Sequence, residues 1–188
     1  CWCSASGMTG VRCPRPPRPR GDAAYDAAMS RIGDFADDDV TGFAVTSPDL
    51  GAAMANFSHA VYTKGRLPLR VREAARIVIA HANECVVCQN TRDGAGDAAG
   101  VDEDLYEHAA EWRTWPGYSD AERIAMEFAH RFATDHTGLR DDDDFWRRAA
   151  EHFDDALITD LAISCAMWVG MGRVLRTLDI GQACKITL

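Results

Sequence analysis

Two cysteines three residues apart, in the run Cys85-Val86-Val87-Cys88, are the residues of this sequence best suited to chemistry. On a helix, side chains at i and i+3 lie on the same side, so the two sulfurs could form a disulfide with little movement of the backbone. Near the start of a helix, free backbone N–H groups and the helix dipole favour a thiolate, which is the form that attacks peroxides and disulfides. The pair therefore predicts redox chemistry.

Two other interpretations of the pair stay open on spacing alone. A structural zinc site needs four ligands, but the sequence has no second C-x-x-C and no H-x-x-x-H pair. Two buried, unreactive cysteines would also fit, because cysteine packs well as a small apolar residue. The other five of the seven cysteines have no such partner spacing: Cys1, Cys3, Cys13, Cys165 and Cys184.

Composition places the chain among ordinary globular proteins of one domain. Of its 188 residues, 47% are hydrophobic and 26% are charged. There are 20 Lys and Arg against 29 Asp and Glu, a net charge of -9. Residues 1–20 hold four Arg and no acid, so the rest of the chain carries 16 bases against 29 acids, or -13. A body this acidic repels phosphate backbones, which argues against nucleic-acid binding.

The first residues form a separate segment rich in proline and arginine. The run R-C-P-R-P-P-R-P-R over residues 12–20 has no apolar core of the kind a secretory signal needs. We expect a disordered tail over 1–21, one helical domain over 22–182 and a short C-terminal tail over 183–188. The longest apolar run, residues 161–171, is too short and too polar at its ends to span a bilayer. This pattern predicts a cytoplasmic protein. In such a protein, paired cysteines favour redox chemistry over a structural disulfide.

The elements that must position the cysteines are predicted to be helices, and the fold class is all-α. No sustained alternation of apolar and polar residues indicates a sheet. Helices are expected over 50–62, over 69–82, from 84 or 85 after an N-cap at Asn83, from about 101, from a capping box at Ser119 and Glu122 to about 134, and finally over a long segment that ends near 179. Asp141 to Asp144 would stabilise the start of a helix through its dipole rather than bind a metal.

Several segments resemble the alkyl hydroperoxidase D-like branch of the carboxymuconolactone decarboxylase superfamily. They are L-P-L-R-V-R-E-A-A-R-I-V-I-A-H-A-N-E-C-V-V-C over 67–88, S-D-A-E-R-I-A-M-E-F-A from 119, H-F-D-D-A-L-I-T-D-L from 152 and G-M-G-R-V-L-R-T-L-D-I from 170. The resemblance covers most of residues 50–180. It implies an all-helical homo-oligomer, a trimer or hexamer, with thiol-dependent peroxidase or disulfide-reductase activity.

The same resemblance assigns roles to individual residues. Cys88 would react with the hydroperoxide substrate, and Cys85 would resolve the product as a disulfide. Glu73, twelve residues before the first cysteine, would act as base or proton relay. A small dithiol or a lipoyl protein would reduce the disulfide, and neither a metal nor a flavin cofactor is needed. The decarboxylase branch lacks the paired cysteines, so C-V-V-C argues against a lactone decarboxylase.

One position departs from the family pattern. Redox members carry a histidine four residues after the second cysteine, and here that residue is Arg92. Arginine cannot release its proton in a protein, although it could stabilise the Cys88 thiolate as a fixed positive charge. Two alternatives therefore stay open: an oligomeric member that keeps the fold with weak or no peroxidase activity, and a small-molecule lyase.

Two further candidates depend on geometry. His81, four residues before Cys85, could replace the missing histidine, but on the apolar face of Ala74, Ile77 and Val78 it could equally be a packed core residue. Glu73 could be a surface partner of an arginine, or a desolvated carboxylate that accepts the Cys88 proton. On one continuous helix, Glu73 and Cys88 would lie roughly 22 Å apart. The relay therefore requires the chain to turn at residues 81–84. The other histidines have no spacing that predicts a site.

Overall fold

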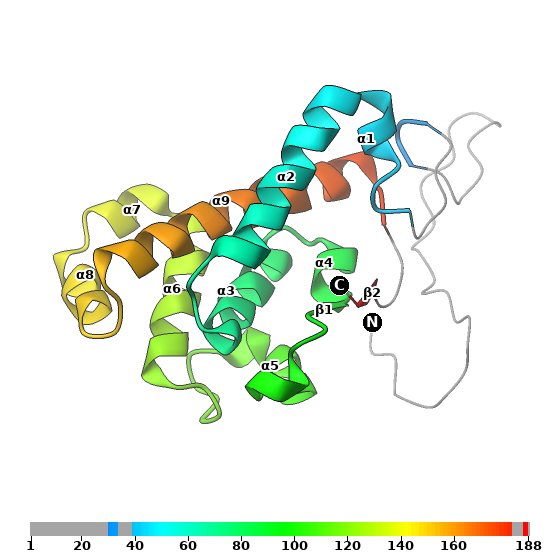
Figure 1. Cartoon of the computed structure of the whole chain (residues 1–188). Coiled ribbons are helices and arrows are strands. Elements are labelled where there is room, and N and C mark those ends of the chain that lie inside the picture. Colours follow the sequence, from blue (N-terminus) through cyan, green and yellow to red (C-terminus); the bar gives the residue numbers. More distant parts are fainter. Residues whose placement is uncertain (1–29, 34–38, 182–185, 188) are drawn as a thin grey trace, which may run out of the picture.

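The computed structural model describes residues 30–33, 39–181 and 186–187, and this part of the chain is built almost entirely of α-helices (Figure 1). The predicted all-α fold class is thereby confirmed. The expected N-terminal tail over 1–21 lies outside the described residues, as does most of the C-terminal segment 183–188. The α-helices are α1 (Phe43–Thr46), α2 (Pro48–Lys64), α3 (Leu69–Ala82), α4 (Val86–Asn90), α5 (Glu103–Glu107), α6 (Asp120–Thr134), α7 (His136–Arg140), α8 (Asp143–Ala150) and α9 (Asp155–Leu178).

Short elements complete the description. Two 3-10 turns cover Asp97–Ala99 and Ala109–Glu111. Strands β1 (Thr91–Arg92) and β2 (Ile186–Thr187) pair in parallel, with Thr91 opposite Ile186. This two-residue pairing joins the segment after α4 to the far end of the chain.

The core of the molecule is centred on α3, which packs against α6 and α9 (Figure 1). Ten consecutive residues of α3, from Val71 to Ala80, are buried. Alanines at several of these positions allow neighbouring helices to approach closely, and Ile77 and Ile79 fill the space between them. Three of the ten are charged: Arg72, Glu73 and Arg76. Buried charges must be paired, so α3 carries a polar network inside the core.

Side chains cap the helices that surround α3. The capping box predicted at the start of α6 is present: Ser119 accepts from the backbone N–H of Glu122, and the Glu122 carboxylate accepts from the N–H of Ser119. The run of aspartates begins α8, where the Asp142 carboxylate accepts from the N–H of Phe145. That hydrogen bond and one from Arg131 lower the pKa of Asp142. The predicted dipole role of the aspartates is consistent with this geometry.

Helix α9 crosses the molecule and presents a stripe of buried side chains to the core. Leu161, Cys165, Trp168 and Leu175 on this stripe are buried, and Cys165 is a free thiol. The expectation that this segment is too short to span a bilayer was wrong, because α9 has 24 residues and is long and apolar enough by length and composition. A core helix passes the same test, and here α9 packs against α2, α3 and α6.

Candidate active site

The chain turns between α3 and α4, as the relay hypothesis requires. Helix α3 ends at Ala82, and Glu84 adopts a left-handed conformation with φ of 51°. The sequence predicted that Asn83 begins the next helix. Instead, Asn83 ends α3, and its backbone N–H donates to the carbonyl of Ile79. Helix α4 instead begins at Val86 with Cys85 as the N-cap, and it ends at Asn90.

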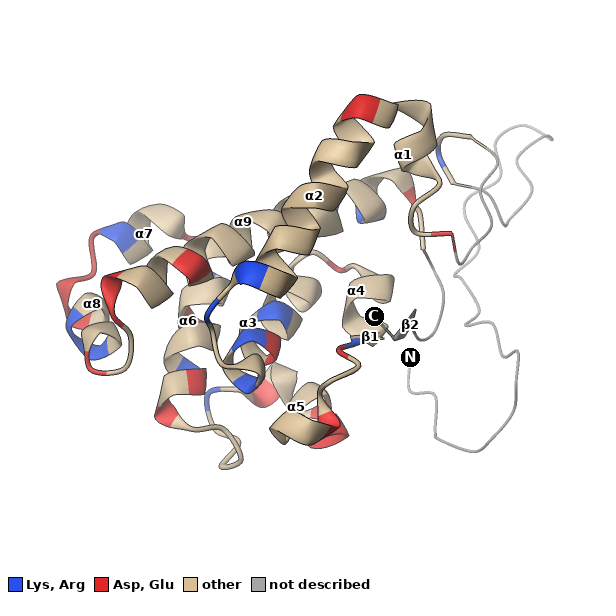
Figure 2. Ribbon diagram, in the orientation of Figure 1, with Lys and Arg blue, Asp and Glu red and all other residues tan. Residues whose placement is uncertain are grey.

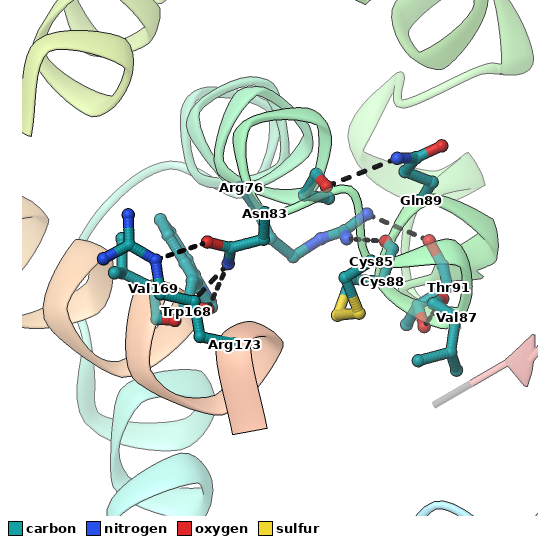
Figure 3. Close-up of a disulfide and its surroundings, with 11 residues drawn as sticks. Arg76, Asn83, Cys85, Val87, Cys88, Gln89, Thr91, Trp168, Val169 and Arg173 are labelled. Carbon is teal, nitrogen blue, oxygen red and sulfur yellow. Dashed lines mark hydrogen bonds between the residues drawn. A yellow bond between two sulfur atoms is a disulfide. The ribbon is translucent and has the colours of Figure 1, made fainter. Parts of the chain in front are cut away.

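A contact with α9 explains why Asn83 ends a helix. Its side-chain amide donates to the backbone carbonyl of Trp168 at 3.0 Å (Figure 3). Gly172 makes this approach feasible, because a Cβ at that position would lie 2.4 Å from the Asn83 Nδ2. The turn is therefore fixed to a helix that lies far away in the sequence.

The turn brings the two cysteines together as a disulfide. Cys85 and Cys88 are bonded through their sulfurs, with their Cα atoms 5.3 Å apart (Figure 3). Cys85 is only 2% exposed and packs with Leu175 and Ile180. Cys88 is partly exposed. The two sulfurs therefore differ in access, and Cys88 is the one that a reagent can reach.

A cavity of about 440 Å³ opens beside Cys88, between α2, α4 and α9. Cys88 lines it and Cys85 does not. Most of the wall is apolar, from residues that include Val40, Phe43, Met54, Val87, Met167, Trp168, Met171 and Leu175. The polar side chains in the lining are those of Thr41, Ser58, His59, Tyr62, Arg76 and Thr91. A cavity of this size and character suits an apolar organic molecule.

Glu73 lies in the buried polar network of α3 and not on the surface. Its side chain is 1% exposed, so the surface ion pair considered for it is excluded. The Oε2 atom accepts from the Arg76 Nε at 2.8 Å and from the Tyr106 hydroxyl at 3.1 Å. The Oε1 atom has no hydrogen-bond partner and lies 3.8 Å from the Arg72 Nε. Glu73 is not among the residues that line the cavity.

Arg76 connects Glu73 to the helix of the cysteines. One terminal nitrogen donates to the carbonyl of Cys88 at 2.6 Å, and the other donates to the carbonyl of Thr91 at 2.9 Å (Figure 3). Burial disfavours the charged guanidinium, but the Glu73 carboxylate together with Tyr62 and Tyr106 outweighs this effect, and the pKa of Arg76 is raised. A permanent positive charge therefore lies at the wall of the cavity that Cys88 lines.

The sequence did not identify Arg76 as a site residue, although it contained a partial signal. Arg76 follows Glu73 by three residues, which predicted an ion pair. It did not predict that the pair is buried and directed at α4, because that depends on how α4 folds back on α3.

Arg92 is directed elsewhere. Its guanidinium forms an ion pair with Glu103 at 3.0 Å and stacks over the Tyr106 ring, 3.8 Å from the centroid. It also donates to the carbonyl of Gln89. Arg92 does not line the cavity. These contacts hold the segment after α4 and leave Arg76 as the cation beside Cys88.

His81 lies outside the site. The residue is exposed, so the expectation that it shares the buried face of Ala74 and Ile77 was wrong. It does not line the cavity. Two residues of α2 that the sequence analysis did not single out, His59 and Tyr62, do line it. Their spacing of three places them on one side of α2, but the sequence alone did not show which side faces the cysteines.

Known proteins resemble this chain in sequence over part of its length and in fold. Residues 48–131, which include both cysteines, match the carboxymuconolactone decarboxylase family. No curated protein matches the sequence. Among solved structures, a protein of unknown function from Agrobacterium tumefaciens, provisionally described as the antioxidant defence protein AhpD, has a TM-score of 0.64 at 17% identity, over 80% of this chain and 96% of its own.

Two other structures share the fold. The debrominase Bmp8 has a TM-score of 0.63 at 20% identity, over 76% of each chain. An AhpD-core, peroxidase-related protein from Ralstonia eutropha has a TM-score of 0.59 at 18% identity, over 75% of this chain and 79% of its own. At these identities the structural matches establish the fold alone. Over residues 48–131 the chain is similar to the carboxymuconolactone decarboxylase family, and it shares the fold of the AhpD-like structures.

Proposed function

We propose that this protein is a thiol-dependent peroxidase that reduces organic hydroperoxides with the Cys85–Cys88 pair. The observation that carries the proposal is the unequal access of the two sulfurs: Cys88 lines an apolar cavity, whereas Cys85 is buried behind it. A peroxidase of this type needs one thiol that reacts with the substrate and a second thiol that lies within bonding distance of the first. The disulfide between the two residues shows that they reach each other.

The reaction balances in three steps. The Cys88 thiolate attacks the terminal oxygen of the hydroperoxide, the S–O bond forms as the O–O bond breaks, and the alcohol leaves after gaining a proton. The Cys85 thiol then displaces water from the Cys88 sulfenic acid and forms the disulfide. An external dithiol, or a lipoyl protein with the same chemistry, reduces this disulfide and is itself oxidised. Attack at the accessible Cys88 sulfur would release Cys85 as the leaving thiolate.

Arg76 supplies positive potential beside the nucleophile. An adjacent cation lowers the pKa of a cysteine, and Arg76 contacts the backbone of Cys88 from within the core. In this proposal Glu73 is a positioning residue that holds Arg76 in its charged, oriented state, rather than a base that touches the Cys88 sulfur. The proposed enzyme would be a cytoplasmic homo-oligomer.

The paired cysteines separate this function from decarboxylase chemistry, which the family also includes. The alternative of a fold-retaining member without activity was motivated by Arg92. Arg92 is engaged with Glu103 and Tyr106, away from the cavity, so its identity leaves the environment of Cys88 intact.

Turnover of an organic hydroperoxide tests the proposal. Full-length protein is reduced with dithiothreitol, and the loss of cumene hydroperoxide is followed with dithiothreitol as the reductant. The wild type should consume hydroperoxide catalytically, Cys88→Ser should not, and Cys165→Ala should retain the rate because Cys165 is a buried thiol of the core. A wild type that consumes no more hydroperoxide than Cys88→Ser would overturn the proposal.

A further inference from the structure

Three contacts, made by Trp168 and Arg72, hold Tyr62 in the cavity wall. The indole N–H of Trp168 donates to its hydroxyl oxygen at 3.2 Å. The Arg72 guanidinium lies 5.0 Å from the centre of its ring and also donates to its backbone carbonyl. Arg72 is itself fixed by an ion pair with Asp93. The phenol is therefore oriented before any ligand enters.

The hydrogen of the Tyr62 hydroxyl has no acceptor among the described residues. A phenol can donate one hydrogen bond as well as accept, and the contact with Trp168 uses only its accepting capacity. Burial raises the pKa of Tyr62, so its proton is retained at neutral and mildly alkaline pH. A phenol in an apolar cavity wall gains a favourable hydrogen bond when a ligand supplies the acceptor.

The Arg76 guanidinium in the wall is already committed. The Arg76 N–H groups are directed at Glu73 and at the carbonyls of Cys88 and Thr91. The Thr91 hydroxyl donates to the carbonyl of Val87. An apolar molecule in this cavity that carries one accepting oxygen therefore finds an oriented, uncommitted donor at Tyr62.

We propose that the Tyr62 hydroxyl donates a hydrogen bond to the oxygen that leaves when Cys88 attacks a bound organic hydroperoxide. This inference rests on the proposed peroxidase function. As the S–O bond forms and the O–O bond breaks, the electron pair of the broken bond remains on the inner oxygen. Tyr62 stabilises that developing alkoxide, and a proton from water at the cavity mouth completes the alcohol.

The variant Tyr62→Phe tests this role, with Tyr118→Phe as the matched control. Tyr118 is a buried tyrosine whose hydroxyl donates to the Leu105 carbonyl, and it does not line the cavity. Stopped-flow oxidation of the fully reduced protein by cumene hydroperoxide should be slower by about a hundredfold in Tyr62→Phe. In Tyr118→Phe the rate should stay at the wild-type value.

Alkylation of Cys88 by iodoacetamide separates a catalytic role from a structural one. This reaction uses the same thiolate but expels iodide rather than an alkoxide, so Tyr62→Phe should leave its rate unchanged. An unchanged peroxide rate in Tyr62→Phe, or an equal loss in both reactions, would overturn the inference while the peroxidase function stands. A wild type that does not react with hydroperoxide at all would overturn the proposed function and this inference with it.

Discussion

Arg76 and Glu73 form the buried ion pair on which the environment of Cys88 depends. The two side chains are 4% and 1% exposed, so neither charge is solvated by water. Replacing Arg76 by Met should leave Glu73 with only the more distant Arg72 as a cationic partner and lower the free energy of unfolding by about 3 kcal/mol, because a poorly paired buried charge is strongly destabilising. Urea denaturation of the reduced protein measures this change.

Two further variants control that experiment. Arg140→Met removes an ion pair with Asp141 that is exposed on both sides, and it should change the unfolding free energy by less than about 1 kcal/mol. Adding Glu73→Gln to Arg76→Met removes the orphaned charge and should recover part of the loss. Equal effects of Arg76→Met and Arg140→Met would contradict the buried-pair account.

Cys165 should not react with thiol reagents in the folded protein. Burial raises the pKa of its thiol, and the thiolate is the form that reacts. After reduction, iodoacetamide at pH 8 should therefore label Cys88 in the native state and label Cys165 only after unfolding in guanidinium. Peptide mapping by mass spectrometry reads both sites, and native labelling of Cys165 at the rate of Cys88 would show that the core opens readily.

At the scale of single residues, the sequence predicted the pair with chemistry but only part of its surroundings. The spacing of Cys85 and Cys88 is a local feature that predicted their proximity, and the structure contains the disulfide between them, whereas their redox role stays a prediction. The orientations of the Arg76 and Tyr62 side chains depend on how α2, α4 and α9 pack together, and local sequence does not show this. Arg92 was placed near Cys88 by counting along a helix, but that helix ends at Asn90.

At the scale of elements, the turn between α3 and α4 stores backbone strain at Glu84. A non-glycine residue with φ of 51° costs roughly 1–2 kcal/mol. Glu84→Gly should therefore raise the free energy of unfolding by about 1 kcal/mol. Glu84→Ala keeps the strain and removes only an exposed ion pair with Arg176, so it should not stabilise the protein. Urea denaturation that ranks alanine equal to glycine would contradict this explanation.

Local signals predicted the long helices well and the short helix α4 poorly. The bounds of α3 and the capping box of α6 follow from residues that are close in sequence. The role of Asn83 and the end of α4 do not follow from residues that are close in sequence. Asn83 bonds to Trp168 of α9, and the chain beyond α4 pairs with β2 near the C-terminus. Such contacts override the propensity of a five-residue helix.

At the scale of the whole molecule, α2 is a long helix with little buried surface, since only Gly51 and Val61 of its 17 residues are buried. Its charged residues are confined to Asp49 near the start and Lys64 at the end (Figure 2). Leu50 is 73% exposed and Phe57 is 38% exposed. Exposed apolar residues on one helix are typical of a surface that binds a partner, and the expected homo-oligomer would supply a second copy of this chain.

Sedimentation of the full-length protein tests this expectation. The wild type should sediment as a multiple of the 20.6 kDa chain, and Phe57→Lys should shift it toward the monomer. A lysine at Asn56, which is exposed on the same helix but polar, provides the control. A monomeric wild type at micromolar concentration would contradict the oligomer.

The central claim is that Cys88, and not Cys85, is the thiol that meets hydroperoxide. In reduced Cys85→Ser the sulfenic acid at Cys88 has no resolving thiol and should persist. One equivalent of cumene hydroperoxide in the presence of a 1,3-diketone trap should therefore give an adduct on Cys88, identified by peptide mapping. The matching variant Cys88→Ser should give no adduct on Cys85, which is buried. An adduct on Cys85 in that variant, or none on Cys88 in Cys85→Ser, would contradict the account.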